Sequence, residues 1–143
     1  MDAQKTEGRI LLAIADRSGV EDVVGELLSL GVRHPISVVY DGMEVLEFVF
    51  STGRHAGRPP GDLALIFLHT DLPVLDGIEV LQRLKRSGPA SAIPVIALGD
   101  DAGGRAAPST ALGAVAFVHM PVDAIELRRA ARAAGLLGGE MDR

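Results

Sequence analysis

The sequence predicts an α/β domain built on a sheet of five parallel strands. Five short apolar segments alternate with segments whose apolar residues recur at helical spacing, which is the pattern of repeated strand–helix units. The chain has 143 residues, of which 48% are hydrophobic, enough for one domain with its own core. Only 3% of the residues are aromatic, so aliphatic side chains must fill that core. Such a core is typical of strands that are buried on both faces.

The first half of the chain contains three expected strands and two expected helices. The five strands of the whole chain are expected at 9–15, 36–40, 63–68, 93–98 and 114–119. The first helix is expected near 19–30, where the helical spacing stops at Gly31. The second helix is expected to start after Asp41, because the Asp41 side chain can accept hydrogen bonds from the free N–H groups at a helix start. Residues 51–61 form a Gly- and Pro-rich loop that is longer than most helix-to-strand connections.

The second half of the chain contains three further helices. They are expected from Asp76-Gly77 to Ser87, over 106–113, and over 122–134. The middle helix should be short, because the segment before it has poor helix-forming character. Residues 1–143 are expected to form a single domain, with flexible tails at 1–8 and 135–143.

The composition excludes several classes of function. The formal net charge of -5 argues against a nucleic-acid partner, since phosphate binding favours a basic surface. The absence of cysteine excludes disulfides, thiol catalysis and thiolate metal sites. The longest apolar runs are much shorter than the roughly 18 to 20 residues that a membrane span needs, and the N-terminus lacks the pattern of a signal peptide. We therefore expect a cytoplasmic protein without membrane contact.

Several segments together carry a family resemblance. They are RILLAIAD (9–16), YDGMEVLEF (40–48), LPVLDGIEVLQRLK (72–85), IPVIAL (93–98) and LGAVAFVHMPVD (112–123). In this order and spacing they make nearly the whole chain resemble a response-regulator receiver domain of two-component signalling. Residues 38–68 are most similar to the stand-alone receivers that serve bacterial phytochromes. The resemblance implies a flavodoxin-like fold with strand order 2-1-3-4-5, five flanking helices and a site at the carboxyl edge of the sheet.

The resemblance also identifies the positions at which receivers perform phosphoryl transfer. In the family, an Asp after strand three is phosphorylated, an acidic pair holds Mg²⁺ beside it, and a hydroxyl residue and a Lys contact the phosphoryl oxygens. Counted from Pro73, the phosphoacceptor position is His69. The acidic pair corresponds to Ile14 and Ala15, the hydroxyl residue to Gly99, and the Lys to Met120.

All of the family's catalytic side chains are therefore replaced, and we interpret the chain as a pseudo-receiver. We expect it to be neither an enzyme nor a phosphoprotein, and to bind no cofactor and no Mg²⁺. His69 is expected to be neutral and hydrogen-bonded. An alignment shifted by one residue would leave Asp16 as the remaining acid of the pair. A metal site formed by His69, Asp16, Asp71 and Asp100 is a weaker candidate, because no regular spacing brings these residues together.

The leading functional hypothesis is a signalling adaptor that binds a protein without phosphorylation. Its partner would be a sensor kinase, a photoreceptor or a second copy of the chain. The resemblance places the partner surface on the fourth helix, the fifth strand and the fifth helix, with Phe117, Pro121, Arg128 and Arg129 as switch or interface residues. It also implies a cis Met120–Pro121 bond. Two alternatives are a phosphorylatable regulator with an unconventional site, and a small-molecule sensor that uses the emptied site.

Overall fold

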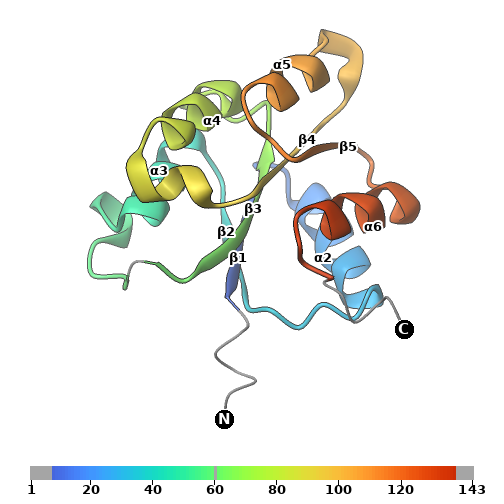
Figure 1. Cartoon of the computed structure of the whole chain (residues 1–143), viewed down its shortest axis with the longest axis horizontal. Helices are drawn as coiled ribbons and strands as arrows, with labels where there is room; N and C mark the ends of the chain where they lie inside the picture. The colour runs from blue at the N-terminus through green and yellow to red at the C-terminus, as the bar shows by residue number, and fades with distance from the viewer. Residues whose placement is uncertain (1–7, 60, 138–143) are drawn as a thin grey trace.

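The computed structural model describes residues 8–59 and 61–137, which form a five-stranded parallel sheet with helices on both faces (Figure 1). The strands are β1 (Arg9–Ala13), β2 (Ile36–Val39), β3 (Leu63–His69), β4 (Val95–Gly99) and β5 (Ala116–His119). Their order in the sheet is β2-β1-β3-β4-β5. The predicted fold class and strand order are both confirmed.

Five α-helices follow the strands within the described residues. They are α2 (Arg17–Ser29), α3 (Gly42–Phe50), α4 (Gly77–Lys85), α5 (Ala106–Ala111) and α6 (Ala124–Ala133). Asp41 caps α3 as predicted, because its side chain accepts a hydrogen bond of 2.7 Å from the Glu44 N–H. The last helix begins two residues later than expected, because Asp123 caps it. None of the described helices has both the length and the apolar character that a membrane crossing requires.

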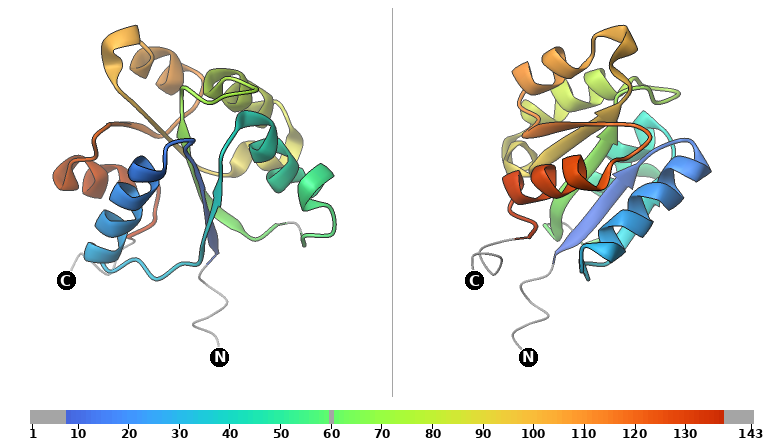
Figure 2. Two further views of the ribbon diagram at one scale, coloured as in Figure 1. Left: turned by 180° about the vertical axis from the view of Figure 1, so that it is seen from behind. Right: turned by 90° about the vertical axis from the view of Figure 1, so that its right-hand side faces the viewer.

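The helices divide the core into two layers, one on each face of the sheet (Figure 2). Helices α2 and α6 cover one face, while α3, α4 and α5 cover the other. The three central strands are almost completely buried, with aliphatic side chains facing both layers. This agrees with the prediction from the low aromatic content, since each central strand must pack on both of its faces.

The ends of the domain differ in part from the sequence prediction. Residues 135–137 were expected to belong to a flexible tail, but Leu136 and Leu137 pack against the core. Gly135 has a φ of +81°, and the Leu136 N–H bonds back to the Ala131 carbonyl, as in a helix C-terminal cap. Leu137 is only 6% exposed. The other residues of the two predicted tails lie outside the described residues, apart from Gly8.

Ion pairs hold the long loop between α3 and β3 against α3. Short 3₁₀ turns occur at η1 (Gly53–His55) within this loop, and at η2 (Gly88–Ala92) and η3 (Asp101–Gly103) elsewhere. Arg54 contacts the carboxylates of both Asp41 and Glu47, and His55 lies 3.0 Å from the Glu44 carboxylate. These ion pairs connect the described part of the loop to α3 and to the residue that caps it.

Candidate functional site

The strand register determines which residues meet at the carboxyl edge of the sheet. Ala13 of β1 pairs with Leu68 of β3, so the next residues along these strands are Ile14 and His69. His69 in turn pairs with Leu98 of β4. The register thus places Ile14 beside the phosphoacceptor position, as the ungapped alignment predicts.

His69 is a partly buried imidazole with a defined hydrogen bond. Its Nδ1 accepts a hydrogen bond of 3.0 Å from the Asp71 backbone N–H, which requires an unprotonated nitrogen. Burial lowers the pKa of His69, although the nearby carboxylates of Asp71 and Asp100 oppose this shift. Both observations favour the neutral imidazole that the sequence predicts at this position.

Apolar side chains occupy the region where the family has charged groups. Ile14 is 2% exposed, and it belongs to the core layer against which Met120 also packs. A Cβ atom built on Gly19 would lie 3.2 Å from Ile14 Cγ2 and 3.5 Å from Met120 Cε, so the two side chains approach the same point. The core therefore extends to an edge where receivers hold Mg²⁺ and a Lys ammonium group. The Met120–Pro121 bond is cis, as predicted.

The space beside Gly99, where the family has a hydroxyl residue, is also filled by other side chains. A Cβ atom on Gly99 would lie only 2.8 Å from Thr70 Oγ1 and 3.5 Å from Phe117 Cζ. Thr70 is buried, and the Phe117 ring is half-buried and packs against the core layer of α3 and α4. Phe117 therefore acts as a core aromatic in this structure, and Thr70 provides a hydroxyl that the alignment did not identify.

Asp16 has a structural role at the start of α2. Its Oδ2 accepts hydrogen bonds from the Gly19 N–H at 3.1 Å and from the Ser18 hydroxyl at 2.6 Å. These bonds, led by the one from Ser18, lower the pKa of Asp16. Among the His, Asp and Glu side chains that the structure describes, which do not include Asp101, no three are grouped so that they could hold a metal ion. The weaker metal-site candidate is therefore not assembled in this structure.

Arg105 is a cation beside His69 that sequence reasoning missed. Its Nη1 donates hydrogen bonds to the Thr70 carbonyl at 2.9 Å and to Asp76 Oδ2 at 2.8 Å. The bond with Asp76 raises the pKa of Arg105, so the guanidinium stays charged. The only sequence signal was a single Arg in a Gly-rich segment, which does not specify a partner some thirty residues away.

A small cavity of about 90 Å³ lies beside this arginine. It is lined by His69, Thr70, Asp71, Asp100, Gly103 and Arg105. The other four replaced positions, at 14, 15, 99 and 120, do not line it. The residual cavity thus lies on the β3–β4 side of the edge, away from the former acidic pair.

The Asp76-Gly77 pair shapes the loop that follows His69. Asp76 Oδ2 accepts a hydrogen bond from the Ile78 N–H and thereby caps α4. The Gly77 N–H donates to the Thr70 carbonyl at 3.1 Å, and a Cβ atom on Gly77 would lie 2.1 Å from the His69 carbonyl oxygen. Only glycine permits this approach of helix and strand end.

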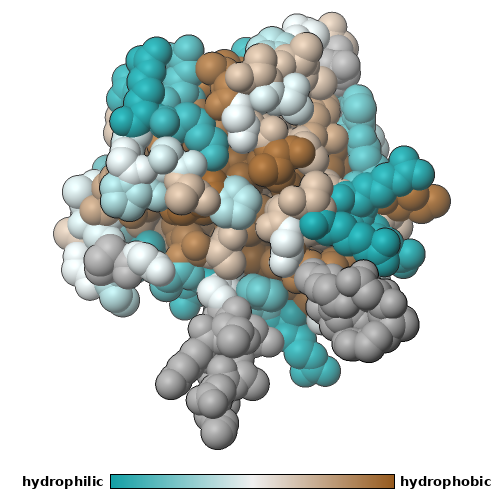
Figure 3. Space-filling view, in the orientation of Figure 1, coloured by the Kyte–Doolittle hydropathy of each residue, from teal (hydrophilic) through white to brown (hydrophobic). Residues whose placement is uncertain are grey.

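The expected partner surface exposes both apolar and basic side chains. Ile125 on α6 is 63% exposed, and the exposed Arg128 and Arg129 follow it at helical spacing. Pro121 and Val115 are also exposed. Figure 3 shows apolar surface next to hydrophilic surface over β5 and α6. The half-buried Phe117 ring lies edge-on to the ring of the exposed His119, with 5.2 Å between the ring centroids.

Comparisons with known proteins find close structural relatives. No family model matches the chain. The structure of the bacteriophytochrome response regulator AtBRR has a TM-score of 0.82 and 32% sequence identity, covering 91% of this chain and 94% of that one. The bacteriophytochrome response regulator RtBRR has a TM-score of 0.83 and 29% identity, covering 90% of this chain and 78% of that one.

A curated relative agrees with these structures. Response regulator Rcp1 from Synechocystis sp. is 27% identical over 99 residues, which is 68% of this chain and 66% of Rcp1. The similarity to AtBRR extends over almost the full length of both chains. This chain therefore belongs to the response-regulator receiver family of two-component signalling.

Proposed function

We propose that this chain is a response regulator that signals without phosphorylation, as a non-enzymatic protein-interaction module in the cytoplasm. The observation that carries the proposal is that Ile14 and Met120, at the Mg²⁺ and Lys positions of the family, are apolar and belong to one core layer. Mg²⁺ requires oxygen ligands, and a phosphoryl group requires cations or hydrogen-bond donors for its charge. The side chains of Ile14 and Met120 supply neither function.

The surrounding groups do not compensate for this loss. Arg105 is close to His69, but its guanidinium is committed to Asp76 and to the Thr70 carbonyl. Asp71 and Asp100 bring negative charge to the same cavity. A phosphoryl group on His69 would therefore meet two carboxylates without a divalent cation between them.

The surface of α5, β5 and α6 is the proposed docking site. Ile125 offers apolar contact area, while Arg128 and Arg129 favour an acidic region of the partner. The likeness to bacteriophytochrome response regulators supports a sensor kinase or photoreceptor as partner. A second copy of the chain is the alternative occupant of the same surface.

The test compares partner binding with and without a phosphodonor. Purified sensor kinases or photoreceptors encoded beside this chain would be titrated with it, in the presence and absence of acetyl phosphate and Mg²⁺. We expect the same affinity in both conditions and a loss with Ile125→Ser or Arg128→Glu. Leu28→Ser is the matched control, because Leu28 is 64% exposed on α2, outside the proposed surface. Binding that requires the phosphodonor would refute the proposal.

One observation favours a second candidate, a phosphohistidine at His69. Arg105 lies close enough to influence the His69 imidazole electrostatically, so a cation does approach the ring. Acid would release the phosphoryl group from a phosphorylated His69. Acid-labile label that disappears in His69→Gln would favour this candidate over the adaptor.

A further inference from the structure

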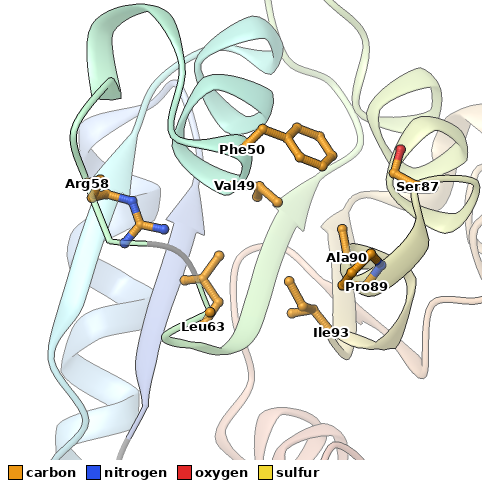
Figure 4. A pocket seen from close by; sticks show the side chains of 9 residues that line it. Val49, Phe50, Arg58, Leu63, Ser87, Pro89, Ala90 and Ile93 are labelled. Carbon is orange, nitrogen blue, oxygen red and sulfur yellow. The ribbon is translucent and has the colours of Figure 1, made fainter.

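A second and larger cavity lies at the opposite edge of the sheet. It has a volume of about 380 Å³, and Figure 4 shows the side chains around it. Its walls come from the end of α3, the loop before β3, the first residue of β3, and the turn after α4. The lining residues are Val49, Phe50, Arg58, Gly61, Leu63, Ser87, Pro89, Ala90 and Ile93.

The walls of this cavity are mainly apolar. Val49 and Ala90 are buried at the cavity, and Phe50, whose side chain lies beside the cavity, is 41% exposed. Ligand sites in proteins are usually apolar hollows of about 300–1,000 Å³ with a few placed polar groups. Both the volume and the lining of this cavity fit that description.

Arg58 is the charged residue that lines this cavity, and its side chain is held in position by several contacts. Its Nε donates to the Phe48 carbonyl at 3.1 Å, and its Nη1 lies 2.9 Å from Asp62 Oδ1. The guanidinium also stacks 3.8 Å above the Phe48 ring. These three contacts fix the side chain and leave its Nη2 without a hydrogen bond among the described residues. A fixed arginine is well suited to bind a planar anion.

The local charge also favours an anion. Asp62 neutralises only one positive charge, yet two arginines contact it, since Arg9 Nε lies 3.3 Å from its Oδ2. The cluster of Arg9, Asp62 and Arg58 therefore carries a net charge of about +1 beside an apolar hollow. An anion with an apolar body would pair with this charge and bury its rings against Val49 and Phe50.

We propose that this cavity binds a small molecule with a compact aromatic body and one anionic group of the carboxylate class, directed at Arg58. A volume of this size suits a two-ring body better than one inserted side chain. The long loop before β3 thereby gains a role, because it carries both Arg58 and Asp62. The proposal is independent of whether the opposite edge is phosphorylated.

A fluorescence titration with two probes tests the proposal. 8-Anilino-1-naphthalenesulfonate has an apolar body of three aromatic rings, a naphthalene and a phenyl, with one anionic group. N-phenyl-1-naphthylamine is the same body without that group. We expect one anionic probe to bind per chain, about tenfold more tightly than the neutral probe, because one charge-assisted bond distinguishes them. 1-Naphthoate should displace the anionic probe, and 1-naphthalenemethanol should displace it about tenfold less well. Equal affinity for the two probes, or no binding, would overturn the proposal.

Three variants localise the site. Ala90→Leu fills the base of the cavity and should abolish the binding of both probes. Arg58→Gln should reduce the affinity of the anionic probe to that of the neutral one. Ser87→Glu adds a negative charge opposite Arg58 without removing its contacts, so it provides the same test if Arg58→Gln does not fold. Unchanged binding of the anionic probe in Ala90→Leu, or in Ser87→Glu, would place the dye elsewhere and refute the proposal.

The control for non-specific dye binding is Leu28→Ser, which removes an exposed apolar side chain from the other face of the sheet. We expect its affinity for both probes to equal that of the wild type. A loss of dye binding in this variant would show that exposed apolar surface binds the probes and would contradict the assignment to the cavity.

Discussion

Gly99 and Thr70 should be energetically coupled, because Thr70 occupies the space beside Gly99. A glycine replaced by alanine in a permitted conformation usually stabilises a protein by about 0.4–1 kcal/mol. Gly99 has no positive φ, so its backbone permits alanine. However, the new Cβ atom would lie 2.8 Å from Thr70 Oγ1. Overpacking a buried site costs about 1–3 kcal/mol, so Gly99→Ala should destabilise the wild type by about 1–2 kcal/mol.

Removal of the Thr70 side-chain oxygen should reverse this effect. In a Thr70→Ala background, Gly99→Ala should be neutral or stabilising, which gives a coupling energy of about 1–3 kcal/mol between the two sites. Leu28→Ala is the distant control, and its effect should add to that of Gly99→Ala within about 0.5 kcal/mol.

Urea unfolding followed by far-UV circular dichroism measures all of these free energies. The chain has no Trp and only one Tyr, so the backbone signal is the better probe. The reasoning is refuted if Gly99→Ala stabilises the wild type, or if Gly99 and Thr70 are as additive as the distant control pair. A confirmed coupling would mean that a hydroxyl residue cannot be restored at position 99 unless Thr70 is also replaced.

Three further predictions concern the same edge. Because the folded-state pKa of His69 lies below its usual 6.5, the unfolded chain binds more protons than the folded chain below that pH, and stability should fall as pH drops below about 6.5. The urea midpoints at about pH 7.5 and 5.5 should therefore differ less in His69→Asn than in the wild type. An equal difference in the two proteins would contradict this prediction. Gly77→Ala should lose about 3 kcal/mol or more in urea unfolding, since its Cβ atom would meet the His69 carbonyl oxygen; a smaller loss would show that the loop can move aside. Calorimetry should detect no Mg²⁺ binding, and a saturable signal that Asp16→Ala abolishes would support the shifted alignment instead.

The sequence allowed the fold to be predicted because its signals are local. Each strand and helix leaves its own apolar periodicity, and the helix starts follow from side chains such as Asp41. The errors at boundaries arose from single residues. Pro94, which has no N–H to donate, delays β4 until Val95, and the Asp123 cap delays α6. Leu137 packs on the core although a short Gly-rich tail was expected there.

The replaced site positions could be predicted from their spacing in the sequence. The residues that surround these positions in the structure could not be predicted in the same way. The ion pair of Arg105 with Asp76 depends on the path of a loop whose sequence has no periodicity. The contact between Thr70 and Gly99 could have been predicted from the strand register, because the pairing of His69 with Leu98 makes the next residues of the two strands neighbours. The larger cavity depends on how the loop before β3 approaches the turn after α4, and no local pattern encodes that distance.

Intact-mass measurement of phosphoryl transfer tests the central claim most directly. The wild type and His69→Asp would each be incubated with acetyl phosphate and Mg²⁺, beside a receiver that has a complete site. The account predicts a mass increase of one phosphoryl group only in the complete receiver, because a carboxylate at position 69 still lacks metal ligands at Ile14 and a cation at Met120. A phosphoryl adduct on the wild type, or stoichiometric labelling of His69→Asp, would contradict the claim that this edge has lost phosphoryl chemistry.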